Sequence, residues 1–278
     1  MDLGIGGKVA LVGGGSRGMG RAVAEGLAAE GARVVIVART QGAIDAAVTD
    51  IVAAGGEACG VAADMFTKAG VAQAVEHCRD RFGSPPGMAI ANVYGTARHS
   101  FDEADDDTFQ GGYSQIVMST VHLARAVLPA MKEKRWGRIV TIGSFCAKKP
   151  HWHVPLIVDN VTRAGAVALN KSLSNEVGRY GITVNTVAPG FIDTEMAVDW
   201  MRSMAIEQGK NPDADRADAQ PGDADPRRDG RADGPQTGHR GRRDRRQAAG
   251  TEPPASQPDQ RLQPVRGRRC PSGPPARR

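Results

Sequence analysis

The sequence contains few cysteines, and their spacing does not suggest a shared role. The four cysteines are scattered along the chain, with no C-x-x-C pair. Structural zinc sites and disulfide-stabilised small domains need cysteines that are clustered or regularly spaced. We therefore expect no metal site, and the cysteine usage indicates a reducing compartment. The cysteines are Cys59, Cys78, Cys146 and Cys270.

Long apolar runs are absent as well. No stretch approaches the roughly 20 apolar residues that a helix needs to cross a bilayer. The first residues also lack a basic segment followed by an apolar one, which is the pattern of a secretory leader. We therefore expect no membrane span and a cytoplasmic protein.

Residues 211–278 lack almost everything that a folded core requires. They contain no aromatic residue, and Leu262 and Val265 are their only large aliphatic residues. They hold 11 of the 17 prolines, and their 15 arginines produce the net charge of +5, because residues 1–210 carry 21 basic and 21 acidic side chains. Such a segment cannot bury enough apolar surface to offset its ordering entropy. We expect one folded domain over residues 1–210 and a disordered tail over 211–278.

The arginine-rich stretch at residues 240–246 (RGRRDRR) could attract nucleic acid by charge alone. It has no interleaved aromatic residues and no recognisable nucleic-acid-binding fold around it, so we expect no specific nucleic-acid partner.

Residues 1–210 show a regular alternation of two patterns. Short apolar runs typical of buried parallel strands alternate with segments that have helical periodicity. The expected strands cover residues 8–12, 33–38, 58–63, 88–91, 138–142 and 183–187. The expected helices cover residues 19–30, 41–54, 69–82, 109–132 and 159–179. This alternation predicts an α/β fold with a doubly wound parallel sheet of the Rossmann type.

A glycine-rich loop, GGSRGMG at residues 14–20, lies between the first expected strand and the first expected helix. Glycines there permit a tight turn and let backbone N–H groups approach a pyrophosphate at the helix N-terminus. In this position the loop predicts a dinucleotide site. The alternative is an ordinary flexible turn.

The end of the second strand indicates which dinucleotide is bound. A carboxylate there would accept a hydrogen bond from the ribose 2′-hydroxyl of NAD. This chain has Ala38 and Arg39 instead, and Arg17 lies in the glycine loop. Two guanidinium groups suit a 2′-phosphate, so we expect NADP(H). The alternative is that both arginines are solvated surface residues.

The order of these features resembles the short-chain dehydrogenase/reductase family over roughly residues 5–205. Glycines of the loop match the family's T-G-x-x-x-G-x-G, Asn92–Gly95 stands at its N-N-A-G, and Ser144 stands at its catalytic serine. The resemblance implies a cofactor-binding set of Gly14, Ser16, Arg17, Gly18, Met19, Gly20, Arg39, Asp64, Asn92, Gly95, Arg163, Pro189, Gly190 and Thr194.

The catalytic part of the resemblance is incomplete. The family uses Asn, Ser, Tyr and Lys, the last two spaced Y-x-x-x-K. Alignment places Ile116 at the asparagine, Asp159 at the tyrosine and Arg163 at the lysine, so only Ser144 is retained. None of the tyrosines has a lysine four residues later; they are Tyr94, Tyr113 and Tyr180. The chain is therefore expected to be a divergent member of the family.

The replacements change the chemistry that the site can perform. Arg163 can still hold ribose hydroxyls, but it stays protonated and cannot relay a proton. Asp159 is a poor proton donor at neutral pH, although it can act as a base, which favours alcohol oxidation. His151 and His153 could supply an acid, or could simply be exposed loop residues. We take Ser144, Asp159 and Arg163 as the catalytic candidates.

Two functions are compatible with these residues. The first is an oxidoreductase that transfers a hydride between NADP(H) and a small alcohol or carbonyl. The second is a non-catalytic NADP(H)-binding protein of the same fold. The resemblance also implies a homodimer or homotetramer, in which helices 109–132 and 159–179 pair across two-fold axes.

The family continues beyond its equivalent of Thr194 with a helix and a last strand, which residues 211–278 cannot supply. We therefore expect the sheet to lack its usual last strand. The Arg, Asp, Pro, Gly and Ala composition of these residues is typical of a GC-rich gene translated in a wrong frame. The hypothesis is a frameshift near codon 211, and the alternative is a genuine disordered extension.

The frameshift hypothesis makes a direct prediction. Translation of the gene downstream of codon 211 in the other two frames should yield an apolar, strand-like run followed by a glycine turn. Nucleotide sequencing of an independent isolate checks this. Failure of both frames to encode such a run would favour the disordered extension.

Overall fold

A computed structural model describes residues 2–92, 95–150, 154–190, 192, 194–207 and 209. All of them belong to a compact unit that spans Met1–Gln220, and a second unit, Pro221–Arg278, lies outside the described residues. Three further residues considered above, Tyr94, His151 and His153, also lie outside the described residues.

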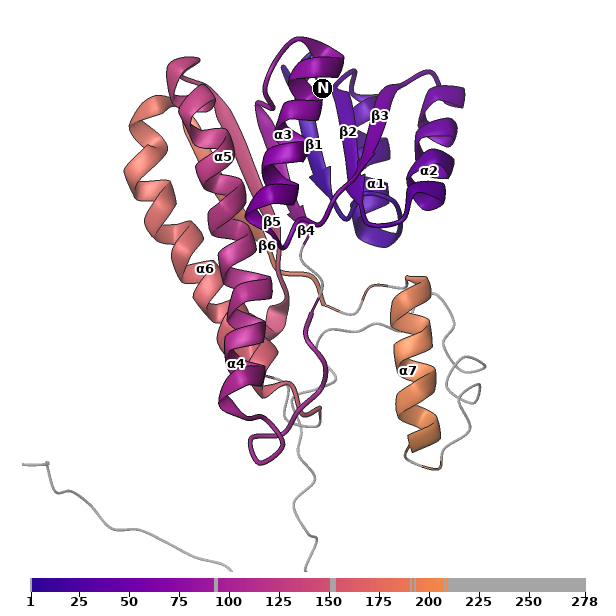
Figure 1. The fold of residues 1–278 in the computed structure, drawn as a ribbon, viewed down its shortest axis with the longest axis vertical. Helices are drawn as coiled ribbons and strands as arrows, with labels where there is room; N and C mark the ends of the chain where they lie inside the picture. Colours follow the sequence, from indigo (N-terminus) through magenta and orange to yellow (C-terminus); the bar gives the residue numbers. More distant parts are fainter. Residues whose placement is uncertain are drawn as a thin grey trace, which may run out of the picture. The chain divides into compact units, whose positions relative to one another are not determined.

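Six parallel strands form one sheet, in the order β3-β2-β1-β4-β5-β6 (Figure 1). The order reverses between β1 and β4, and ligands of open parallel sheets bind at the carboxyl end of such a switch point. The predicted Rossmann-type fold is thus confirmed. The strands are β1 (Val9–Gly13), β2 (Arg33–Ala38), β3 (Glu57–Ala62), β4 (Met88–Asn92), β5 (Gly137–Ile142) and β6 (Ile182–Val187).

Helices cover both faces of this sheet. One core cluster joins Val35 and Val37 to residues of α3, α5 and α6, and the other joins Val34 and Ile36 to residues of α1 and α2. The central run of β2 is fully buried because helices pack on both of its faces. The helices are α1 (Gly18–Ala29), α2 (Gln41–Ala53), α3 (Lys68–Phe82), α4 (Asp106–Tyr113), α5 (Ser119–Glu133), α6 (Ile157–Val177) and α7 (Glu195–Glu207).

The long helix expected over residues 109–132 is divided. Helix α4 begins at Asp106, where the Asp105 carboxylate caps it, and the hydroxyl and N–H of Thr108 that bond to this carboxylate lower the pKa of Asp105. A π-helical turn, η1 (Ser114–Met118), then separates α4 from α5. Side-chain hydroxyls stabilise this turn: Ser119 Oγ donates to the Gln115 carbonyl, and Thr120 Oγ1 donates to the Ile116 carbonyl.

Strand β6 forms one edge of the sheet. It pairs with β5, and no further strand joins it among the described residues. The chain then passes through Pro189 to α7, and the residues in which a last strand would follow lie outside the described part of the chain. In that same part, no helix is long and apolar enough to span a membrane.

Substitution of two helical glycines by alanine should change the stability in opposite directions. An added Cβ at Gly70 would lie 2.1 Å from the Asp64 carbonyl oxygen, whereas at Gly26 it would meet nothing within 4 Å. We expect Gly70→Ala to lower the free energy of unfolding by about 2 kcal/mol or more, because backbone atoms must move apart. Gly26→Ala should raise it by about 0.5–1 kcal/mol, because alanine has the higher helix propensity.

Urea unfolding followed by circular dichroism measures both changes. Equal effects of the two substitutions would contradict the close approach of α3 to the backbone of Asp64.

Candidate active site

The glycine loop closes tightly around its own backbone. Gly14 and Gly18 have positive φ angles of 62° and 54°, which favour glycine. An added Cβ at Gly20 would lie 2.1 Å from the Gly14 carbonyl oxygen, so α1 starts as close to β1 as its backbone allows. Asn92 Nδ2, at the end of β4, donates to that same carbonyl at 3.3 Å.

The N-terminus of α1 is left open for an anion. Its N-cap residue, Arg17, is extended and makes no side-chain capping bond, and the first turn contains no acidic residue. Free N–H groups and the helix dipole therefore point to the loop, as a pyrophosphate requires. Ser16 is buried within the loop, with 8% of its surface exposed, and Met19 packs against the core. These residues fit a dinucleotide.

The two predicted phosphate-binding arginines are available. Arg39 follows directly after β2, and both Arg17 and Arg39 are exposed. Within the described residues, neither side chain forms a hydrogen bond or an ion pair. Asp64, which follows β3, is half-buried, and its Oδ1 accepts from the Phe66 N–H at 3.0 Å. The geometry thus keeps two cations free at the carboxyl end of the sheet.

The segment after β6 returns to the glycine loop. Thr194 approaches Gly18, since its methyl carbon lies 3.7 Å from where a Cβ on that glycine would be. Its Oγ1 also caps α7 by accepting from the Ala197 N–H at 3.2 Å. The Pro189 carbonyl accepts from the Phe145 N–H at 3.0 Å, which ties this segment to the turn after β5, and Gly190 is exposed.

Asp159 and Arg163 form a shielded ion pair on α6. Arg163 Nε donates to Asp159 Oδ2 at 2.9 Å, and each side chain is only 11% exposed. Asp159 Oδ1 accepts two further bonds, from the N–H of Thr96 at 2.7 Å and from its hydroxyl at 2.9 Å. Both carboxylate oxygens are therefore occupied by donors.

Gly95 lies directly against this pair. A Cβ added there would lie 2.7 Å from Asp159 Oδ2 and 3.0 Å from a terminal nitrogen of Arg163. The Gly95 carbonyl accepts from Gln115 Nε2, in the π-helical turn, at 3.2 Å. The structure thus brings together Gly95, Asp159 and Arg163.

Ser144 and Ile116 stand at the other two positions that the alignment compares with the family's catalytic residues. Ser144 follows β5, and its Oγ accepts from the Cys146 N–H at 3.2 Å, so that it caps the short 3-10 helix η2 (Phe145–Ala147). Helix α6 packs against η2, which places the Ser144 turn beside the Asp159 helix. Ile116, at the asparagine position, is buried and supplies only its carbonyl.

Two residues that hold this site were not found from the sequence. Thr96 binds the carboxylate across a separation of 63 residues, and Gln115 binds Gly95 across 20 residues. Gln115 directly precedes Ile116. The alignment therefore identified the correct turn of the helix, but not the side chain that contacts Gly95. Thr96 directly follows the N-N-A-G position, and this neighbourhood was the only feature of the sequence that could have pointed to it.

The described residues contain no cluster of three or more His, Cys, Asp or Glu side chains that could hold a metal ion.

The chain is similar to known proteins in both sequence and structure. The chain is 37% identical over 195 residues to the 3-oxoacyl-(acyl-carrier-protein) reductase FabG of Escherichia coli, a match that covers 68% of this chain and 75% of the reductase. A crystal structure of L-sorbose reductase from Gluconobacter frateurii, complexed with NADPH and L-sorbose, is similar with a TM-score of 0.70 and 35% identity, covering 76% of this chain and 80% of that one.

A 7α-hydroxysteroid dehydrogenase complexed with NADH and 7-oxo glycochenodeoxycholic acid is also similar, with a TM-score of 0.67 and 25% identity over 73% of this chain and 80% of that chain. The family profile described as short chain dehydrogenase matches residues 8–205, from the first strand to α7. With the glycine loop, the strand order and the Ser144 turn in agreement, this chain belongs to the short-chain dehydrogenase family.

Proposed function

We propose that the chain transfers a hydride between NADP(H) and a small alcohol or carbonyl substrate. The observation that carries this is the uncapped N-terminus of α1 behind a glycine loop packed at backbone contact. NADP(H) is the cofactor, and when bound it supplies or accepts the hydride. The NADPH complex of the L-sorbose reductase supports this choice of cofactor.

The fold alone does not choose between the two nicotinamide dinucleotides, because one similar structure holds NADPH and another holds NADH. The choice is made by side chains at the end of β2. Arg39 and Arg17 would hold the 2′-phosphate, with the loop N–H groups on the pyrophosphate. Asp64 would face the adenine, and Asn92, Arg163 and Thr194 would lie toward the ribose and nicotinamide.

The proton is handled by the pair on α6. Three donors address the Asp159 carboxylate and fix its orientation: the N–H and hydroxyl of Thr96, and Nε of Arg163. As a base, Asp159 would take the hydroxyl proton of an alcohol, while Ser144 Oγ would hydrogen-bond the same oxygen. Arg163 would remain charged throughout and would hold the carboxylate in place. This assignment favours alcohol oxidation over carbonyl reduction.

The second candidate, a non-catalytic NADP(H)-binding protein, is favoured by a specific observation. Both oxygens of Asp159 and the Oγ of Ser144 already serve bonds that hold the backbone or the ion pair. Side chains that stabilise loops in this way can be retained for folding alone. Nucleotide binding without turnover of any alcohol or carbonyl in a broad panel would identify this function.

The cofactor preference depends on Arg39. We expect Arg39→Asp to weaken NADPH binding by roughly 1–3 kcal/mol and to favour NADH, because a charge-assisted bond to the 2′-phosphate becomes a repulsion. Titration of nucleotide fluorescence measures both affinities, and Arg33→Lys, on the same strand, serves as the control. The assignment is wrong if the wild-type chain binds NADH at least as tightly as NADPH.

The proton-transfer role depends on Asp159. Asp159→Asn should lower the rate of alcohol oxidation by about 100-fold or more, the usual contribution of a general base, with NADPH binding retained. The substitution also leaves Arg163 shielded and unpaired, which lowers stability.

The variant Asp159→Asn/Arg163→Gln serves as the control for stability, because it removes both charges together; its NADPH affinity is measured separately, because Arg163 would lie toward the ribose. Steady-state kinetics on the folded fractions separate the two effects. Full turnover in Asp159→Asn would mean that another group transfers the proton.

A further inference from the structure

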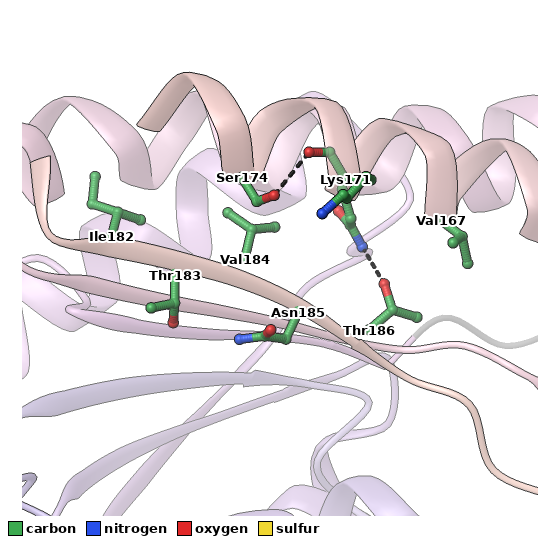
Figure 2. A pocket seen from close by; sticks show the side chains of 9 residues that line it. Val167, Lys171, Ser174, Ile182, Thr183, Val184, Asn185 and Thr186 are labelled. Carbon is green, nitrogen blue, oxygen red and sulfur yellow. Dashed lines mark hydrogen bonds between the residues drawn. The ribbon is translucent and has the colours of Figure 1, made fainter. Parts of the chain in front are cut away.

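Helix α6 carries polar side chains at two places along its length. Near its middle, Asn170, Lys171 and Ser174 line a groove of about 410 Å³ beside β6 (Figure 2). The Asn170 Nδ2 donates to two threonine hydroxyls, and its Oδ1 has no hydrogen-bond partner among the described residues. In the first turn of the helix, by contrast, three donors reach the carboxylate of Asp159.

The two oxygens of the Asp159 carboxylate carry unequal numbers of donors. Oδ1 accepts from the N–H of Thr96, at 2.7 Å, and from the hydroxyl of the same residue, at 2.9 Å. Among the described residues, Oδ2 accepts only from Nε of Arg163, at 2.9 Å. A carboxylate offers about four acceptor positions, two on each oxygen. Thr96 therefore fills both positions of Oδ1, and one position remains on Oδ2.

The space beside Oδ2 depends on a glycine. A Cβ added at Gly95 would lie 2.7 Å from Oδ2 and 3.3 Å from Oδ1, so a side chain there would crowd Oδ2 first. The Asp159 side chain as a whole is 11% exposed. The oxygen with the unused acceptor position is thus also the oxygen that glycine keeps clear of a side chain.

We propose that Oδ2 of Asp159 is the atom that receives the proton of the alcohol, and that Thr96 is the positioning residue that enforces this choice. The inference rests on the proposed function, in which Asp159 is the base. In this step the alcohol O–H bond breaks and an Oδ2–H bond forms. The carbinol carbon gives its hydride to NADP⁺, which leaves a carbonyl.

A proton on Oδ2 leaves the existing hydrogen bonds of the carboxyl group in place. It takes the one acceptor position that neither Thr96 nor Arg163 uses, whereas a proton on Oδ1 would displace a bond from Thr96. Transfer at Oδ2 therefore requires no rearrangement of the carboxyl group, and this is the condition that a preorganised site meets.

Two substitutions separate the hydroxyl of Thr96 from its methyl group. The methyl carbon packs toward α4, since it lies 3.2 Å from where a Cβ on Gly112 would be. Thr96→Val keeps a methyl and the N–H but removes the hydroxyl, which opens a second acceptor position on Oδ1. Thr96→Ser keeps the hydroxyl and removes the methyl. A positioning role predicts a defect in the first variant and rescue in the second, whereas a packing role predicts the reverse.

Steady-state oxidation of 2-propanol and the other alcohols of the panel by NADP⁺ measures the kinetic effect in the full chain. In Thr96→Val, kcat should fall roughly ten-fold with little change in KM, because one charge-assisted hydrogen bond no longer orients the carboxylate. Thr96→Ser should restore kcat to near the wild-type value, and circular dichroism verifies the fold of each variant. Equal losses of kcat in the two variants, or a loss confined to Thr96→Ser, would overturn the positioning role.

A crystal structure of the NADP⁺ complex soaked with 2-propanol tests the choice of atom without requiring turnover. In the wild type, an alcohol or water oxygen should lie within about 3.2 Å of Oδ2, and none should bond to Oδ1. In Thr96→Val, a second oxygen should appear at Oδ1. An oxygen bonded to Oδ1 in the wild type, or none at Oδ2, would overturn this inference alone. Absence of any alcohol oxidation, with the oxygen in place at Oδ2, would instead overturn the proposed function and with it the proton transfer.

Discussion

The contact between the Gly14 carbonyl and Gly20 constrains the whole cofactor half of the molecule. Because no Cβ fits between them, α1 can start immediately behind β1 and direct its free N–H groups across the loop. Asn92 bonds to the same carbonyl, so the end of β4 is held against the end of β1. Backbone packing and the side-chain amide of Asn92 thus fix the geometry of the sheet's switch point, without any contribution from a bound nucleotide.

The candidate catalytic site depends on a different kind of interaction, an ion pair with little solvent exposure. Asp159 and Arg163 are shielded together, and removing charges from water costs several kcal/mol each unless they are fully paired. The two bonds from Thr96 complete that pairing and fasten the segment after β4 to α6. A carboxylate as shielded as Asp159 is accompanied here by an arginine and a threonine that bond to both of its oxygens.

The sequence predicted the parts that local patterns determine. The bounds of β2 and the position of the glycine loop agree with expectation, because buried parallel strands and glycine turns leave their mark within a few residues. The π-helical turn was missed, since hydroxyl-to-carbonyl bonds from Ser119 and Thr120 do not disturb apolar periodicity. The roles of Thr96 and Gln115 were missed because their partners lie far away in the chain.

The π-helical turn has an evolutionary consequence. Such a turn holds one residue more than the regular helix that would replace it, so it behaves as a single-residue insertion absorbed within a helix. Loss of one codon within residues 114–118 would restore a regular helix and rotate everything before it by about 100°. Helix α4 would then present another face to α6, and Gln115 would no longer reach the Gly95 carbonyl. The number of residues in this short turn therefore matters more to the site than the identity of most side chains in the turn.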